Sequence, residues 1–195
     1  TSSRTARMRA GSNSRPGAPP PPRPCPGAPA AGAAGGGPRG RAEHALAVAA
    51  GVRRGAARPG RDRVRPTPIV ETAIVGAAIG AALAGMRPVA EIMINDFLAV
   101  CMDQVANHAA KLRYMSGGRT KVPLTIRTVT AGFVGSFGAQ HSQSLEAWLA
   151  HTPGLKVVCP SNPYDAKGLL LSAIRDDDPV MFFEPKRIYR AAKGE

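Results

Sequence analysis

The chain has 195 residues, a formal net charge of +13 and 44% hydrophobic residues, which is enough for one domain, or for one domain and a tail. It has no apolar stretch long enough to span a bilayer, so we expect a soluble protein that is not bound to membranes. Cys25, Cys101 and Cys159 are odd in number and far apart, which argues against a disulfide framework or a zinc site and indicates free thiols in a reducing compartment.

Residues 1–65 carry most of the positive charge, with 13 Arg, no Lys and two acids. They are rich in Pro, Gly and Ala, and cannot bury enough apolar surface to offset the entropy of ordering, so we predict a disordered basic tail. A nucleic-acid-binding arm or a transit peptide are alternatives. The absence of aromatic residues for base stacking and the Pro and Gly content argue against them. Our leading hypothesis is that the tail is mistranslated, from a wrong frame or an upstream start in GC-rich DNA.

From Pro66 onward the pattern is that of a compact α/β domain. Its first half predicts a helix over 72–85, a strand over 88–93, a helix over 97–115 that is closed by glycines, and a strand over 122–128. A glycine-rich loop over 130–138 follows, and then a helix from 144 with Leu145, Trp148 and Leu149 on one side. The last elements predicted are a strand over 155–159, a helix over 162–173 and an apolar strand over 179–183. This alternation predicts a mostly parallel sheet with helices on both faces. Ligands of such sheets bind beyond the carboxyl ends of the strands, here the loops 95–97 and 128–142.

Glu71 ends the run Thr-Pro-Ile-Val-Glu, directly before a small, apolar segment. One interpretation is an exposed acid in the first turn of a helix, where it favours the positive end of the helix dipole. The other is a buried acid that exchanges a proton with a ligand. The pattern around Glu71 leaves both open.

His141 lies in the polar cluster Ala-Gln-His-Ser-Gln-Ser, within an otherwise apolar neighbourhood. Histidine exchanges protons near neutral pH, and Gln140 and Gln143 could orient its ring for acid–base work. A histidine at a helix start with no chemical role is the alternative. A Ser–His nucleophilic pair is disfavoured because no nucleophile-elbow pattern is present.

Several segments together resemble one family. They are DRVRPTPIVE, GMRPVAEIMINDF, DQVANHAAKLRYMSGG, AQHSQS, HTPGLKVVCPSNPYDAKGLLLSAIRDDDP and FFEPKRIYR. In this order and spacing they resemble the transketolase-like, thiamine-diphosphate pyrimidine-binding domain of the beta subunit of 2-oxoacid dehydrogenase first components, which act in the pyruvate, branched-chain and acetoin dehydrogenase complexes. The resemblance implies an oxidoreductase subunit that decarboxylates a 2-oxoacid, with pyruvate favoured, and passes the acyl group to a lipoyl acyltransferase.

The resemblance also implies roles for individual residues. Glu71 would hydrogen-bond the aminopyrimidine of the cofactor and activate it, and Phe97 would pack against that ring. His141 would act near the reacting centre in acyl transfer to the lipoyl group. A potassium site, which many members of the family have, would use Leu124, Thr125, Ala173, Asp176 and Asp178.

Other implications concern partners and extent. The Mg²⁺ and diphosphate of the cofactor would be held by an alpha subunit in an alpha2–beta2 heterotetramer, and the chain would be inactive without it. Beta subunits of the family begin with a strand and helix in place of the tail, and continue past Glu195. We therefore expect residues 66–195 to be a pyrimidine-binding domain without the family's start and C-terminal domain. A bacterial cytoplasmic location is favoured, or the mitochondrial matrix in a eukaryote. Two alternatives from another functional class remain: a non-catalytic fragment, and a protein that binds nucleic acid through its basic arm.

Overall fold

The computed structural model of the chain describes residues 45–49, 63–132, 138–189 and 191. All of them belong to the unit Gly36–Glu195. Most of the predicted tail lies outside the described residues, so its disorder and its origin stay predictions, as does a domain start at residue 66.

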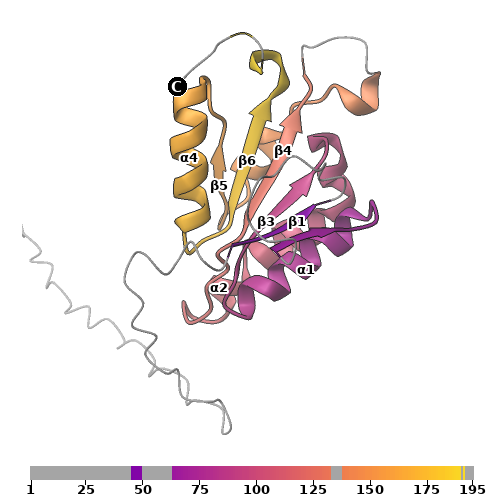
Figure 1. Cartoon of the computed structure of the whole chain (residues 1–195). Helices are drawn as coiled ribbons and strands as arrows, with labels where there is room; N and C mark the ends of the chain where they lie inside the picture. The colour runs from indigo at the N-terminus through magenta and orange to yellow at the C-terminus, as the bar shows by residue number, and fades with distance from the viewer. Residues whose placement is uncertain (1–44, 50–62, 133–137, 190, 192–195) are drawn as a thin grey trace, which may run out of the picture. The chain divides into compact units, whose positions relative to one another are not determined.

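A six-stranded sheet forms the centre of the described unit (Figure 1). Its strands are β1 (Ala45–Ala49), β2 (Val64–Pro66), β3 (Arg87–Ile92), β4 (Thr125–Thr130), β5 (Lys156–Val158) and β6 (Val180–Pro185), in the order β2-β1-β3-β4-β6-β5. Every pair of neighbouring strands is parallel. The predicted α/β class with a parallel sheet is therefore confirmed.

The first two strands were not expected. β1 lies inside the stretch predicted to be a tail, and pairs in register with β3 from Ala45 opposite Arg87 to Ala49 opposite Glu91. Its sequence, ALAVA, is short and surrounded by Arg, Pro and Gly, so local propensity gives little sign of a strand. The sheet therefore extends further towards the N-terminus than the composition indicated.

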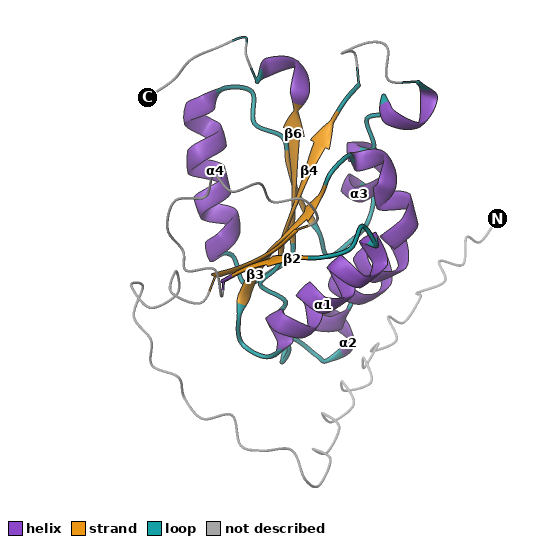
Figure 2. Cartoon of the chain, turned by 45° about the vertical axis from the view of Figure 1, so that its right-hand side comes forward, coloured by secondary structure: helices purple, strands orange, loops and turns teal. Residues whose placement is uncertain are grey.

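Helices cover both faces of the sheet, as Figure 2 shows with the sheet seen nearly edge-on. One face carries α4 (Pro163–Arg175), and the other carries α1 (Glu71–Leu83), α2 (Leu112–Met115) and α3 (Glu146–Ala150). α4 begins as predicted, because the Asn162 side chain accepts a hydrogen bond from the Asp165 N–H at 2.8 Å and Pro163 occupies the first turn.

The predicted long helix over 97–115 is not one regular α-helix. The segment forms a 3-10 helix, η2 (Asn95–Cys101), then a π-helix, η3 (Asp103–Ala109), and then α2, which ends before the left-handed Gly117 and Gly118. Six apolar residues recur every three or four positions in this segment. Four of them are buried, Leu98, Cys101, Val105 and Ala109, while Met102 and Leu112 are partly buried. Periodicity identified the buried face, but packing against the sheet changed the size of the turns.

Trp148 is a second correction. It was expected to share a packed face with Leu145 and Leu149, but its exposed fraction is 51% while both leucines are buried. α3 is only five residues long, so it presents one or two positions to the core rather than a continuous stripe.

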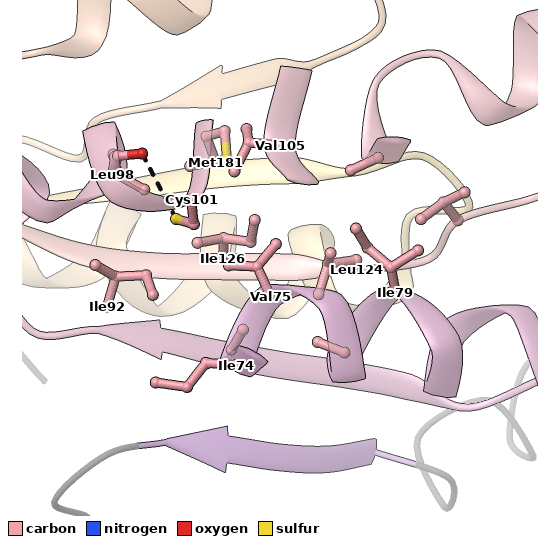
Figure 3. Close-up of a cluster of buried hydrophobic side chains, with 14 of the residues drawn as sticks. Ile74, Val75, Ile79, Ile92, Leu98, Cys101, Val105, Leu124, Ile126 and Met181 are labelled. Carbon is pink, nitrogen blue, oxygen red and sulfur yellow. Dashed lines mark hydrogen bonds between the residues drawn. The ribbon is translucent and has the colours of Figure 1, made fainter. Parts of the chain in front are cut away.

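The main hydrophobic core lies between the sheet and the α1 layer (Figure 3). Ile74, Val75 and Ile79 of α1 meet strand residues such as Ile126 and the η2–η3 residues Leu98, Cys101 and Val105. A smaller cluster under α4 contains Ala173, Val180 and Phe182. Residues 180–183 of β6 are all buried, as expected for a strand that is covered on both faces. Among the described helices, none has the length and apolar character of a membrane span.

Gly154 gives a test of this packing. It has φ +102, and a Cβ added there would lie 2.0 Å from the Ala110 carbonyl oxygen. Gly154→Ala should therefore lower the free energy of unfolding by about 1–3 kcal/mol. Gly168→Ala is the matched control: its Cβ would meet no atom within 4 Å inside α4, so it should stabilise by about 0.5–1 kcal/mol. Urea denaturation of both variants measures the two effects, and equal stabilities would contradict the packing at Gly154.

Candidate functional site

Glu71 is the first residue of α1 and is half-buried. Its carboxylate makes no hydrogen bond or ion pair with any residue that the structure describes. The start of α1 is tied to η2, because the Thr72 hydroxyl donates to the Val100 carbonyl oxygen at 3.1 Å. The carboxylate at the beginning of α1 thus has no partner in the part of the chain that the structure describes, and its partial burial leaves both interpretations of Glu71 open.

The pKa of the Cys101 thiol shows that Glu71 lies near η2. Burial raises the pKa of the Cys101 thiol to about 12, and the negative charge of Glu71 adds to that shift. The thiol donates to the Leu98 carbonyl oxygen at 3.6 Å and lies 4.0 Å from that of Phe97. Glu71 and the segment that carries Phe97 therefore share one neighbourhood at the carboxyl end of β3.

Phe97 and His141 are in direct contact. Their ring centroids lie 5.3 Å apart with an interplanar angle of 89°, an edge-to-face arrangement. The two residues are 44 positions apart, on η2 and on the short 3-10 turn η4 (Ala139–His141). The fold thus joins two of the predicted site residues through ring contact, and joins Glu71 to the same region through Cys101.

Sequence reasoning did not find the residues that hold this arrangement. Asn95 and Asp96 are both buried, and their side chains hydrogen-bond Gln143 and Leu145, in the segment that follows His141. The sequence did contain a signal for them, because two adjacent polar residues directly after a buried parallel strand lie where ligand sites form.

The surroundings of Glu71 suit a flat, partly apolar ligand with polar groups. Ile69, Val70, Met93 and Val100 are exposed near the start of α1 and the end of β3. The Thr67 and Thr128 hydroxyls, from the segments before α1 and along β4, are buried without a partner among the described residues. A carboxylate without a partner among the described residues and a nearby aromatic ring are groups that would bind an aminopyrimidine, so Glu71 and Phe97 fit the pyrimidine half of thiamine diphosphate.

Two cavities of about 630 and 420 Å³ lie elsewhere, one beside Arg113 and Lys156, the other between α4 and β6. Neither is lined by Glu71, Phe97 or His141. The candidate site residues, each half-buried, thus lie apart from both of these cavities.

The five residues predicted to bind potassium meet at the opposite end of the strands. The Leu124 carbonyl oxygen accepts from the Val180 N–H at 2.9 Å, and the Ala173 carbonyl oxygen accepts from the Asp176 N–H at 3.2 Å. Thr125 is buried beside them at the start of β4. The Lys156 ammonium donates to both oxygens of Asp176, at 2.8 and 2.7 Å, and to Asp178 at 3.3 Å.

The acid side chains at this end are therefore already paired. Arg113 also bonds Asp178, and Arg87 binds Asp177 together with the Ile174 and Asp176 carbonyl oxygens. Within the described residues, no group of three or more His, Cys, Asp and Glu side chains could hold a metal ion. Potassium here would have to use the free lone pairs of backbone carbonyls, so this donor set fits it only in part.

A scan against protein families matches residues 28–192 to "Transketolase, pyrimidine binding domain". Among curated relatives, the chain is 57% identical over 140 residues to the acetoin:2,6-dichlorophenolindophenol oxidoreductase subunit beta of Cupriavidus necator, covering 71% of this chain and 41% of the relative. It is 53% identical over 137 residues to the 2-oxoisovalerate dehydrogenase subunit beta of Bacillus subtilis, covering 70% and 41%. It is 48% identical over 148 residues to the pyruvate dehydrogenase E1 component subunit beta of Acholeplasma laidlawii, covering 76% and 44%.

The chain thus spans less than half the length of these relatives. Among solved structures it is similar to a split-gene transketolase, described as an inactive beta4 tetramer, with a TM-score of 0.60 and 19% identity over 73% of this chain and 45% of that one. At that identity the likeness shows the fold alone.

The Lys156 ion pairs predict a pH-dependent stability. Burial opposes ionisation of Asp176, but hydrogen bonds from Lys156 and the Asp178 N–H outweigh it and hold the pKa of Asp176 below its ordinary 3.8. The hydrogen bond to Asp176 in turn raises the pKa of Lys156 above 10.5. An acid whose pKa is lower in the folded chain stabilises the fold at pH values above its pKa in the unfolded chain. That contribution is lost as the pH falls below about 4.

Lys156→Met should therefore lower the free energy of unfolding at pH 7 by up to about 1 kcal/mol, because the ammonium is half exposed and screened by solvent. The difference from wild type should shrink as the pH falls from about 4 to 2. Lys167→Met, on the exposed surface of α4, is the matched control. Urea titrations at several pH values measure the effect, and a difference that is constant with pH would contradict it.

Proposed function

The chain belongs to the transketolase pyrimidine-binding domain family, and on that premise we propose that it is the pyrimidine-binding part of the beta subunit of a thiamine-diphosphate-dependent 2-oxoacid dehydrogenase. The proposal is carried by the carboxylate of Glu71, which has no partner among the described residues and lies near η2, whose Phe97 contacts His141. The beta subunits to which the chain is 48–57% identical support the same assignment.

Pyruvate is the substrate we propose, with oxidative decarboxylation and acyl transfer to a lipoyl acyltransferase. Acetoin is the second candidate, favoured by 57% identity to an acetoin oxidoreductase subunit. A branched-chain 2-oxoacid is the third, since identity to a 2-oxoisovalerate dehydrogenase subunit is 53%. Turnover of the three substrates by one preparation would distinguish them.

When bound, thiamine diphosphate supplies the nucleophilic carbon and the electron sink for decarboxylation. Glu71 would share a proton with the ring nitrogen of the pyrimidine, and the apolar ring of Phe97 would help to hold the pyrimidine and exclude water. His141 would donate or accept a proton during acyl transfer, a role that histidine often takes in enzymes.

The site is half of an interface. Near the start of α1 and the end of β3 several apolar side chains are exposed, and such apolar patches mark contacts with other chains: Ile69, Val70, Met93 and Val100. We propose that an alpha subunit covers this surface in an alpha2–beta2 assembly and holds the Mg²⁺ and diphosphate. Potassium, bound through backbone carbonyls of Leu124 and Ala173, is part of the proposal.

Replacing the ionisable acid tests the role of Glu71. In the complex reconstituted with its alpha subunit, Glu71→Gln should lower the rate of decarboxylation by about 10²–10⁴-fold, because proton exchange with the cofactor is lost. The circular dichroism spectrum should not change. Asp103→Asn, an exposed acid in the first turn of η3, is the matched control and should retain activity. Full activity of Glu71→Gln would overturn the assignment.

Two assays separate the role of His141 from decarboxylation itself. His141→Asn should lower acyl transfer to a lipoyl acceptor by about 10²–10⁴-fold, while decarboxylation coupled to an artificial electron-accepting dye falls much less. His108→Asn, an exposed histidine of η3, is the control. Equal losses in both assays would refute a role confined to transfer.

A further inference from the structure

The first two residues of η2, shortly after the end of β3, are both polar and both buried. Asn95 has an exposed fraction of 0% and Asp96 of 6%. Buried amides and carboxylates are costly unless they are hydrogen-bonded, so their partners indicate what they hold in place. Nearly all of those partners lie on other segments of the chain.

Asn95 joins the end of β4 to the segment after His141. Its Nδ2 donates to the Val129 carbonyl oxygen at 3.2 Å and to the Gln143 carbonyl oxygen at 2.9 Å. Its Oδ1 accepts from the Leu145 N–H at 3.0 Å. One amide group therefore fixes the distance between the carboxyl end of β4 and residues 143–145.

Asp96 holds the same segment from its other side. Its Oδ1 accepts from the Gln143 N–H at 3.2 Å and from the Gln143 side-chain amide at 2.9 Å. Gln143 thus has its carbonyl oxygen bound by Asn95 and its N–H and side chain bound by Asp96. It is held two residues after His141.

Two further contacts tie the same parts of the chain. The Thr130 hydroxyl donates to a Glu146 carboxylate oxygen at 2.9 Å. Gly132 lies so close to Ser144 that an added Cβ would be 2.3 Å from its hydroxyl oxygen. The segment that follows His141 is therefore anchored at several points to the chain that leaves β4.

Phe97 follows Asp96 directly, so the residues that hold the His141 segment also carry the ring that His141 contacts. We propose that Asn95 and Asp96 are positioning residues that set the His141 ring edge-on to Phe97 for acyl transfer. The proposal rests on the proposed function for its chemistry. The geometric part rests on the hydrogen bonds and on the 5.3 Å ring contact alone.

The first experiment measures the ring contact without any activity. In the full 195-residue chain, nuclear Overhauser effects between the Phe97 and His141 ring protons should be present in wild type. Asn95→Asp keeps the acceptor for Leu145 but turns a carboxylate oxygen towards the Val129 and Gln143 carbonyl oxygens, so these effects should be lost. Asn107→Asp is the matched control, since Asn107 is exposed and bonds only to Asp103 on its own helix.

A second set of variants tests the same contact if Asn95→Asp does not fold. Asp96→Asn retains an oxygen that accepts both bonds from Gln143, and should keep the ring contact. Asp96→Leu should lose it. Gln143→Ala removes one side-chain bond at an exposed position and should weaken the contact while leaving the chain folded. Ring contacts that are unchanged in folded Asp96→Leu and Gln143→Ala would overturn the proposal.

The second experiment uses the complex with its alpha subunit. Asp96→Leu and Gln143→Ala should lower kcat for transfer to a lipoyl acceptor by about 10–100-fold, because misplacement of a reacting group by about 1 Å has such effects. Dye-coupled decarboxylation should fall much less, and Asp96→Asn should restore transfer. A parallel fall in both rates would overturn the positioning role. If wild type itself does not decarboxylate, the proposed function fails, and the ring-contact measurement alone decides the geometric proposal.

Discussion

The parallel pairing of β3, β4 and β6 is the constraint on which the candidate site depends. Parallel strands bring their carboxyl ends to one edge of the sheet, so segments far apart in sequence leave it side by side. The core beneath α1 then fixes the height of that helix and of η2 above the sheet. Phe97, which follows β3, and His141, which follows β4, become neighbours because these strands share a direction.

The fold could largely be predicted because its signals are local or repetitive. Alternating strands and helices indicated a parallel sheet, and Asn162 with Pro163 marked the start of α4. The irregular turns of η2 and η3 and the exposure of Trp148 could not be predicted, since they follow from packing against strands distant in sequence. β1 was not predicted for the same reason, because residues 45–49 form a strand through pairing with β3 more than through their local propensity.

The candidate site was predictable in a different way. Family resemblance pointed to Glu71, Phe97 and His141, but nothing in their separate neighbourhoods said that the rings of Phe97 and His141 would meet. That contact depends on Asn95 and Asp96, whose partners lie about 50 residues away. Among the residues predicted to bind potassium, the sequence showed the acids but could not show that Lys156 and Arg113 bond them.

Cys101 lies next to a site proposed to handle activated acyl groups, for which a thiolate would be a competing nucleophile. Burial, with a smaller contribution from the negative charge of Glu71, raises the pKa of the Cys101 thiol to about 12, so the thiol stays protonated at neutral pH. Burial of this side chain in the core is thus the main reason that the sulfur stays unreactive, and Glu71 adds to it. The packing that places η2 beside α1 therefore also keeps a competing nucleophile away from the proposed site.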